Sequence, residues 1–448
     1  MVITRQLAIP KPSSAVRKAN ELYAELEKTF PVVDASFYKD LVCPKNWKDH
    51  PYDRWFKLKE GYSSYMIEHL LKEFNASPTD WVLDPFLGSG STLVGARNAR
   101  VKGAGFEVNP FLARLSKVKM HGRYDARALR ARVNDLFRAV AEQRPIEIGM
   151  PALTITGKLF REQLDTLLRI KQDIWTEPDP HVRDFLALGL GCILERCSYA
   201  RKDGNGLKYP KSKKPLPLVP TLERQYDLMI DDVAKGIPAT DHFIVNADSR
   251  RIRAEEIVQA GGDLANDFLD HARFSIFSPP YANCFDYTEV YKIELWMLDF
   301  IKDYPQLRTL RDSSVSSHLN KQYEGKESFP STLPDLDYVV DLIPWEDTWG
   351  KYKMKAMVLH YFEDLKAVFT RLHDILGDKG TVVCIVGNSA YGNVPIATDL
   401  FLAEYLRELG FGKVMIRAAR ILGTSSQQQV VLRGNPYLRE SLVIASPC

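Results

Sequence analysis

A strand, a glycine-containing turn and a helix follow one another near residue 85, and this order constrains the fold more than any other feature of the chain. Residues 81–83 are apolar (WVL), residues 84–92 read DPFLGSGST, and a helical pattern follows. Glycine has no Cβ and tolerates positive φ, so such a turn lets the backbone approach a ligand closely. The turn alone is shared by many nucleotide-binding domains, and it predicts an α/β sheet with a ligand at the strand ends.

A second short string also ends an apolar strand. Residues 274–277 (FSIF) precede residues 278–281 (SPPY). The two prolines remove backbone N–H donors and stiffen the chain, which leaves carbonyls and the Ser278 hydroxyl to accept hydrogen bonds. Alone, this string is more often a surface turn. Paired with the glycine turn, and also at the C-terminal end of a strand, it indicates that one site cradles a cofactor and the other grips an amino group, as in methyl transfer to an exocyclic amine.

These residues resemble motifs of a known family. Residues 84–92 resemble motif I of the prokaryotic DNA amino-methyltransferases, which use S-adenosylmethionine (AdoMet), and residues 278–281 resemble their catalytic motif IV. Residues 103–110 (GAGFEVNP) are similar to the second strand of that family, whose terminal acid holds the ribose hydroxyls. Further similar segments are residues 55–57, 61–64, 386–389 and 396–399. The resemblance covers about residues 50–120 and 241–445.

The resemblance implies that residues between 62 and 109, together with Asp248, form a cofactor site. Its implied AdoMet-binding residues are Tyr62, Ser63, Asp84, Pro85, Phe86, Gly88, Ser89, Gly90, Ser91, Thr92, Glu107, Asn109 and Asp248. Asp84 and the glycine turn would shape the methionine pocket, and Glu107 would take both ribose hydroxyls. Asp248 would accept from the adenine amine, or would instead be a helix N-cap ahead of Ser249.

The resemblance also implies a catalytic loop, which consists of Ser278, Pro279, Pro280 and Tyr281. Hydrogen bonds from the target amine to the Ser278 side chain and the Pro279 carbonyl would favour a nucleophilic nitrogen, which attacks the sulfonium methyl in line. Tyr281 would stack on the extruded base, because the target atom cannot be reached inside a duplex. This scheme needs no metal and no covalent intermediate, and the loop lacks the Pro-Cys nucleophile of a cytosine-C5 methylase.

The first residue of this loop bears on the target base. The family tends to carry Ser there when it methylates cytosine N4, and Asp or Asn when it methylates adenine N6, so Ser278 favours cytosine N4. Adenine N6 stays open as the alternative, because any of these side chains accepts from an amine. Two other classes also stay open: an RNA amino-methylase, for which an appended RNA-binding domain would be expected, and an inactive DNA-binding subunit, against which the intact motifs argue.

The spacing of apolar runs predicts an α/β fold of seven short strands with helices between them. The resemblance implies that these strands form a Rossmann-like seven-stranded AdoMet methyltransferase sheet with a mostly helical insertion. The predicted strands are residues 81–83, 104–108, 243–246, 274–277, 381–386, 414–418 and 442–445. The resemblance implies that the last two form an antiparallel hairpin, as in that family, joined by a polar stretch through residues 427–429. The predicted domains are an N-terminal helical extension (1–50), a catalytic domain (51–120 with 241–448) and a helical insertion (121–240) that is the candidate DNA target recognition region.

Positive charge gathers at the end of the predicted insertion. The net charge of +3 is too small to argue for nucleic acid by itself, so any affinity for DNA must come from local clustering. The predicted DNA-binding residues are Arg201, Lys202, Lys208, Lys211, Lys213 and Lys214. Most charge runs are solvated loops, but phosphate contact is the better interpretation in an enzyme that must hold DNA. A second polar insertion, about residues 302–355, could complete the recognition surface.

Composition agrees with this interpretation. The 448 residues, 45% hydrophobic and 26% charged, suit an ordinary soluble protein with room for one large domain and an insertion. No run approaches 18 apolar residues, and residues 1–12 lack the apolar core of a signal peptide. The six cysteines form no Cys-x-x-Cys pair, so neither zinc nor a disulfide framework is expected. We therefore expect a cytoplasmic protein with AdoMet as cofactor, double-stranded DNA as partner, a cognate restriction endonuclease as a further candidate partner, and no membrane.

Overall fold

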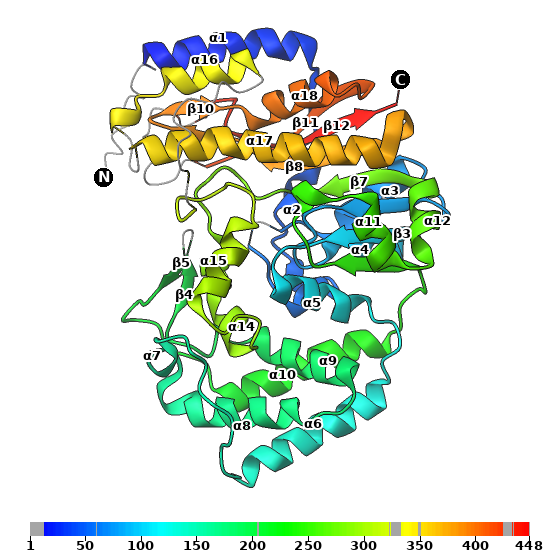
Figure 1. The fold of residues 1–448 in the computed structure, drawn as a ribbon, viewed down its shortest axis with the longest axis vertical. Coiled ribbons are helices and arrows are strands. Elements are labelled where there is room, and N and C mark those ends of the chain that lie inside the picture. Colours follow the sequence, from blue (N-terminus) through cyan, green and yellow to red (C-terminus); the bar gives the residue numbers. More distant parts are fainter. Residues whose placement is uncertain are drawn as a thin grey trace, which may run out of the picture. The chain divides into compact units, whose positions relative to one another are not determined.

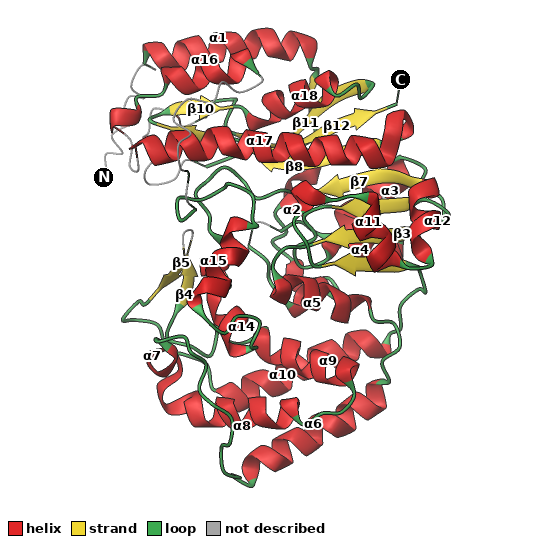
Figure 2. Cartoon of the chain, viewed as in Figure 1, coloured by secondary structure: helices red, strands yellow, loops and turns green. Residues whose placement is uncertain are grey.

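The computed structural model describes residues 13–59, 61–203, 206–321, 323, 333–347, 351–423, 432 and 434–447. The chain forms two compact units, and Figures 1 and 2 show their elements along the sequence and by type. The first unit comprises Met1–Asp40, Phe274–Cys284 and Val315–Cys448; the second comprises Leu41–Arg273 and Phe285–Ser314.

Strands of the first unit run in the order β1-β11-β12-β8-β7. Their bounds are β1 (Val32–Asp34), β7 (Ala272–Phe277), β8 (Thr381–Gly387), β11 (Lys413–Ile421) and β12 (Arg439–Ser446). β12 is antiparallel to both β11 and β8, whereas β1 with β11 and β7 with β8 are parallel pairs. Every residue of β8 is buried, which explains why the run TVVCIVG is almost wholly apolar or β-branched.

Helices of the first unit are α1 (Ser14–Thr29), α16 (Pro334–Leu342), α17 (Lys351–Leu376) and α18 (Thr398–Glu408). Ser13 precedes α1 as its N-cap, and its side chain accepts from the backbone nitrogen of Val16. The buried residues of α1 recur every three or four positions, so one face of the helix is apolar. A short hairpin of β9 (Ser389–Tyr391) and β10 (Val394–Ile396) completes this unit, and the Tyr23 hydroxyl of α1 donates to the Pro395 carbonyl over 2.7 Å.

Three parallel strands of the second unit, β2 (Trp81–Asp84), β3 (Lys102–Phe106) and β6 (His242–Val245), lie in the order β2-β3-β6. Parallel strands point their carboxyl ends to one edge, so the residues that follow them meet there. The flanking helices are α3 (Ser64–Glu73), α4 (Ser91–Asn98) and α5 (Pro110–Met120). α3 and α4 approach closely, because a Cβ at Gly95 would lie 2.4 Å from the Ser64 carbonyl oxygen.

The rest of the second unit is mainly helical. Its helices include α6 (Ala126–Ala141), α8 (Leu164–Trp175), α9 (Pro180–Gly191), α10 (Leu218–Ala234), α11 (Ala254–Gly261), α12 (Leu264–His271), α13 (Tyr287–Val290), α14 (Lys292–Met297) and α15 (Tyr304–Asp312). β4 (Arg201–Asp203) and β5 (Gly206–Lys208) form an antiparallel pair inside this segment. Asp125 and Asp179 are the N-caps that precede α6 and α9, and each accepts from two backbone nitrogens.

The predicted α/β fold is confirmed, and each of the seven predicted strands overlaps a strand of the structure. β1 was not predicted. The helical segment 121–240, which the sequence predicts as an insertion, belongs to the same compact unit as β2 and β3. Residues 1–12 and the predicted polar stretch through 427–429 lie outside the described residues. Within the described part of the chain, no helix is long and apolar enough to span a bilayer.

Candidate functional site

The glycine turn after β2 adopts the backbone conformation that its sequence predicts. Gly88 and Gly90 have φ values of +53° and +87°, and α4 begins directly after Gly90. A Cβ at Gly90 would lie 2.8 Å from Oγ of Ser116, so the position has no room for a side chain. The Ser116 hydroxyl in turn donates to the Gly88 carbonyl over 3.1 Å. The turn is therefore held in one shape by α5.

Asp84, the last residue of β2, is fully buried and receives three hydrogen bonds. They come from Oγ1 of Thr92 (2.5 Å), the backbone nitrogen of Phe86 (2.8 Å) and the hydroxyl of Tyr62 (2.9 Å). Desolvation raises the pKa of Asp84 to about 6, although these donors oppose the rise. Tyr62, Asp84 and Thr92 were all predicted site residues, and the structure brings them together.

Glu107 follows β3 and is almost fully buried. Its Oε2 accepts from the backbone nitrogen of Gly88 and its Oε1 from that of Asn109, each over 2.7 Å. Desolvation, the largest cause, raises the pKa of Glu107 to about 7. A carboxylate offers about four lone-pair sites, so two backbone donors leave capacity for more.

Asn109 lies beside this acid with one buried group unused. Its Oδ1 accepts from the backbone nitrogen of Phe111 over 3.0 Å and caps α5. Its Nδ2 is buried and has no hydrogen-bond partner among the described residues. A carboxylate with spare acceptor capacity next to an orphaned amide donor fits a vicinal diol, such as the ribose of AdoMet, which both donates and accepts.

Two buried charged residues support the turn and were not predicted. The Asp53 carboxylate accepts from the backbone nitrogen of Ser64 (2.9 Å) and from the Ser91 hydroxyl (3.1 Å). Nζ of Lys119 donates to the Ser89 carbonyl over 2.7 Å, and desolvation lowers the pKa of Lys119 to about 8. Neither residue stands in a recognisable motif. Lys119 lies between Val118 and Met120, whereas Asp53 is followed by Arg54, so no shared sequence signal marks the two residues.

Ser63, also a predicted site residue, is the N-cap of α3. Its hydroxyl accepts from the backbone nitrogen of Tyr65 over 3.2 Å and lies 2.7 Å from Nδ1 of His50. Ser63 therefore caps the helix that packs on α4, rather than contacting the glycine turn through any described bond.

Asp248 is the N-cap of a short 3-10 helix, as one of its two interpretations predicted. Its Oδ1 accepts from the backbone nitrogen of Arg250 over 3.0 Å, and the Arg250 guanidinium pairs with Oδ2 over 2.7 Å. The next residue, Ser249, donates to the Pro85 carbonyl and so joins this segment to the glycine turn. Asn246 was not predicted, and its Nδ2 donates to the Glu107 carbonyl over 2.6 Å.

The loop after β7 lies in the first unit. Ser278 and Pro280 are half-buried, and Pro279 and Tyr281 are buried. Oγ of Ser278 lies 3.4 Å from the hydroxyl oxygen of Tyr281, which donates to Oε1 of Glu440 over 2.7 Å. The Pro279 carbonyl makes no described contact that competes with a substrate amine. The loop thus combines one hydroxyl and one carbonyl as acceptors with an aromatic ring.

Residues of the β9–β10 hairpin hold the end of this loop. The hydroxyls of Ser389 and Tyr391 both donate to the Ala282 carbonyl, the former over 2.6 Å. Sγ of Cys284 lies 3.9 Å from Sδ of Met357, and burial raises the pKa of this thiol to about 11. A thiol that stays protonated at neutral pH suits packing rather than nucleophilic attack.

The predicted DNA-binding residues fall into two groups on and after the β4–β5 pair. Side chains of Arg201, Lys208, Lys211 and Lys214 are exposed, and Lys208 pairs with Asp203. The structure contradicts a phosphate contact for Lys202, whose side chain is 6% exposed and forms an ion pair with buried Glu294 of α14. Lys213 donates to the backbone carbonyls of Glu195 and Ala200, so its ammonium is also engaged within the protein.

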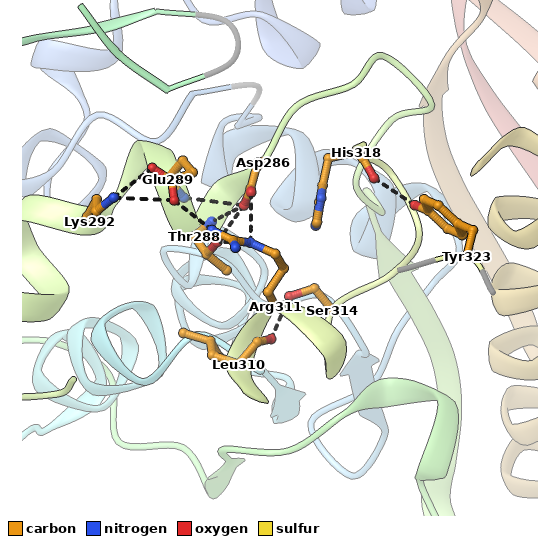
Figure 3. A network of polar contacts seen from close by, with 9 residues as sticks. All are labelled: Asp286, Thr288, Glu289, Lys292, Leu310, Arg311, Ser314, His318 and Tyr323. Atoms are coloured by element: carbon orange, nitrogen blue, oxygen red, sulfur yellow. Dashed lines mark hydrogen bonds and ion pairs between the residues drawn. The ribbon is translucent and has the colours of Figure 1, made fainter. Parts of the chain in front are cut away.

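Acidic groups near this hairpin are neutralised within the second unit. β5 packs on α13, and a Cβ at Gly206 would lie 3.7 Å from Cβ of Glu289. Figure 3 shows the guanidinium of Arg311, on α15, between Glu289 (2.6 Å) and Asp286 (3.1 Å), while Lys292 lies 3.1 Å from Glu289. Arg311 and Lys292 therefore pair with Glu289 of α13, and Arg311 also pairs with Asp286, the N-cap of α13.

The predicted polar insertion at about 302–355 is described only in part. α15 and α16 lie within it, and residues 322, 324–332 and 348–350 lie outside the described residues. In its first-unit part, the Tyr323 hydroxyl donates to the His318 carbonyl over 2.6 Å (Figure 3). Throughout the described ranges, no group of three or more His, Cys, Asp or Glu side chains is placed to hold a metal ion.

Parallel strands, a glycine turn after β2 and an acid after β3 give the chain the mixed α/β fold of Rossmann-like methyltransferases. Sequence comparison with known proteins supports this fold class. The chain is 26% identical over 459 residues to the Type II methyltransferase M.BsoBI of Geobacillus stearothermophilus, a match that spans 91% of this chain and 88% of that protein. It is 25% identical over 447 residues to the Type II methyltransferase M.AvaI of Anabaena variabilis, spanning 91% and 89%.

A shorter stretch of 94 residues is 31% identical to the Type II methyltransferase M.MjaII of Methanocaldococcus jannaschii and spans 21% of this chain and 16% of that protein. The chain matches no model of a known protein family.

Proposed function

We propose that this protein is a site-specific DNA methyltransferase that transfers a methyl group from AdoMet to the N4 amine of cytosine, as the modification enzyme of a restriction-modification pair. One observation carries the proposal: the chain combines a glycine turn tied to the acid after β3 with a Ser-Pro-Pro-Tyr loop after β7. The similarity to Type II methyltransferases across nine-tenths of the chain supports the same class.

In this proposal the second unit binds the cofactor. Glu107 accepts from the ribose hydroxyls, Nδ2 of Asn109 supplies a donor beside it, and the turn through Gly88 and Gly90 admits the methionine part close to the backbone. Asp84 fixes the start of the turn through Thr92 and Tyr62. Bound AdoMet supplies an electrophilic methyl group on a sulfonium. Binding favours the ionised form of Glu107, because only the carboxylate accepts at both oxygens.

The loop of the first unit prepares the amine. An exocyclic amine is conjugated with its ring, so its lone pair is a poor nucleophile. Ser278 and the Pro279 carbonyl accept the two amine hydrogens, which favours a tetrahedral nitrogen whose lone pair is free to attack in line. Tyr281 offers a ring on which the extruded base stacks. Transfer breaks the bond between the methyl carbon and the sulfonium sulfur, which leaves as a neutral thioether, and the methylated nitrogen releases one proton to water through its hydrogen-bond acceptors.

DNA is held, in this proposal, by the exposed cations of the β4–β5 hairpin and the segment after it. Arg201, Lys211 and Lys214 are exposed, and about half of the Tyr209 surface is accessible. Exposed cations beside an aromatic ring suit a phosphate backbone. Lys202 and Lys213 are not part of this surface, because both ammonium groups are bound within the protein.

The decisive experiment is nucleoside mass spectrometry of unmethylated bacterial DNA after incubation with the full chain and AdoMet. We expect N4-methyldeoxycytidine in the parent reaction and none with Tyr281→Ala, the matched inactive variant. N6-methyldeoxyadenosine instead would assign the alternative base, and methylation of a parallel tRNA sample alone would assign RNA. A chain that binds AdoMet yet methylates no nucleic acid would overturn the proposal.

A further inference from the structure

Three residues on adjacent strands of the first unit form one row across the sheet. Gly387 on β8 is the register partner of Glu440 on β12, and Glu440 is the register partner of Arg420 on β11. Side chains directly opposite each other in antiparallel pairs lie on the same face of the sheet. The register of β11 shifts between Ala418 and Arg420, and the extra residue of this bulge is what brings Arg420 opposite Glu440.

The ring of Tyr281, in the loop after β7, lies against Gly387 of this row. A Cβ at Gly387 would lie 2.8 Å from Cε2 of Tyr281, so the ring fills the space that a side chain would need. The Tyr281 hydroxyl donates to Oε1 of Glu440 over 2.7 Å, and Nε of Arg420 pairs with Oε2. Glu440 is 2% exposed, so these contacts are shielded from water. The ring is thereby fixed at its edge by Gly387 and at its hydroxyl by Glu440.

This arrangement also fixes the direction of a hydrogen-bond chain. The Glu440 carboxylate, paired with Arg420, has no proton to give, so Tyr281 must donate to it. The single hydroxyl hydrogen of Tyr281 is then used. In the 3.4 Å contact between the two hydroxyls, Ser278 is therefore the donor and Tyr281 the acceptor. The Ser278 proton points toward Tyr281, and the lone pairs of its oxygen remain for an incoming amine.

We infer that Glu440 is a positioning residue for the proposed methyl transfer: it touches no substrate, but it seats the Tyr281 ring and orients the Ser278 hydroxyl as an acceptor. The inference rests on the proposed function. It assigns a role to a residue 159 positions from Tyr281 in the chain, outside every motif of the sequence.

Glu440→Gln is the sharpest probe, because Arg420 decides how the amide turns. Arg420 donates and needs the glutamine oxygen, so the amide NH2 is directed at Tyr281. Tyr281 must then accept, and its own hydrogen turns toward Ser278. The Ser278 proton is displaced toward the amine, where an acceptor is needed. Tyr281→Phe, in contrast, keeps the ring and removes the hydroxyl, so Glu440 no longer determines the orientation of the Ser278 hydroxyl hydrogen.

The test is a double-mutant cycle of the full chain, with kcat and KM measured for AdoMet and DNA. We expect a kcat loss of about tenfold for Tyr281→Phe, a larger loss for Glu440→Gln, and a double variant no slower than Tyr281→Phe alone. KM for AdoMet should stay within about twofold, because the cofactor residues lie on other elements. A purely structural role would instead make the double variant slower than either single variant.

Glu404→Gln is the matched control, since Glu404 of α18 is a buried glutamate of the same unit that has no described contact with the loop. Its kcat should equal that of the parent. If Tyr281→Phe has the kcat of the parent, or if the losses in the cycle are additive, the role of Glu440 is overturned. The proposed function still stands in that case, provided that the parent is active. An inactive parent would overturn both. If Glu440→Gln does not fold, a cycle of Tyr281→Phe with Ser278→Ala decides, and additivity there overturns the inference.

Discussion

Oε2 of Glu107 accepts a hydrogen bond of 2.7 Å from the backbone nitrogen of Gly88. The two residues follow neighbouring strands, β3 and β2, so the acid proposed to hold the ribose also fixes the turn proposed to admit the methionine part. Removal of this carboxylate therefore changes two features of the cofactor site together.

Glu107→Gln should raise the dissociation constant for AdoMet by on the order of tenfold to a hundredfold, since hydrogen bonds to a charged acceptor contribute about 1.5–3 kcal/mol. A glutamine keeps one acceptor oxygen but places an amide donor against either the Gly88 or the Asn109 nitrogen. Isothermal titration calorimetry measures the change. Affinity for DNA, measured on the same preparation, should be unchanged, and unaltered AdoMet binding would remove Glu107 from the site.

AdoMet binding to the parent should weaken as the pH falls from 8 to 6. Burial raises the pKa of Glu107 to about 7, so the carboxylate is mostly ionised at the upper pH and mostly protonated at the lower one. Protonation removes acceptor capacity, so affinity is present above the pKa and falls away below it. Titrations across this range should show the decrease in the parent and a flatter profile in Glu107→Gln. Equal slopes for both would assign the pH dependence to another group, such as Asp84, whose pKa is raised to about 6.

Ser278→Ala should lower kcat by less than Tyr281→Ala does, because the Pro279 carbonyl remains as one acceptor for the amine. Ser278→Asp keeps an acceptor and adds a charge, so it should retain part of the activity and shift the ratio of methylated cytosine to methylated adenine toward adenine. Mass spectrometry of the nucleosides reports both quantities. Parent rates in both alanine variants would show that residues 278–281 form only a turn.

The triple variant Arg201→Gln, Lys211→Gln, Lys214→Gln should weaken DNA binding and flatten its salt dependence. Removing one cation that neutralises a phosphate reduces the slope of log affinity against log salt by about 0.9, so the three substitutions together reduce it by up to about 2.7. Fluorescence anisotropy at several salt concentrations gives the slope. Lys28→Gln, an exposed lysine on α1, is the control and should leave it unchanged. An unaltered slope in the triple variant would show that the segment is a solvated surface.

Lys202→Met should destabilise the protein by about 3–5 kcal/mol, because it leaves the buried Glu294 carboxylate without its cation. The double variant Lys202→Met, Glu294→Leu should recover most of this stability, since both charges are then gone. Chemical denaturation measures both. A destabilisation below about 1 kcal/mol in the single variant would mean that Glu294 becomes protonated at little cost, which its raised pKa would permit.

Strands and turns of this protein are predictable from sequence because buried parallel strands are short apolar runs, and the glycines mark positions where φ is positive. β1 escapes such a prediction, since three residues carry no periodicity. The role of a charged residue within a charge run is not predictable from sequence. Lys202 and Lys208 have the same chemistry in the sequence, yet one is buried on Glu294 and the other is exposed, and only tertiary packing separates them.

Residues that contact a motif from a distant part of the chain cannot be predicted from sequence either, because only tertiary packing brings them to the motif. Glu440 meets Tyr281 only through the register of β8 and β12, and Asp53 meets Ser91 only when α3 packs on α4. The motifs themselves, which contain consecutive residues, could be found without that knowledge.

The basic residues of the β4–β5 hairpin and of the segment after it are subject to two different constraints on sequence change. Lys202 anchors the hairpin on α14 and cannot vary independently of Glu294, whereas Arg201, Lys211 and Lys214 face solvent and form no part of that anchor. Substitutions at the exposed positions can therefore accumulate one at a time without unfolding the hairpin. In descendants of this chain, the surface proposed to contact DNA can diverge rapidly while the framework beneath it stays the same.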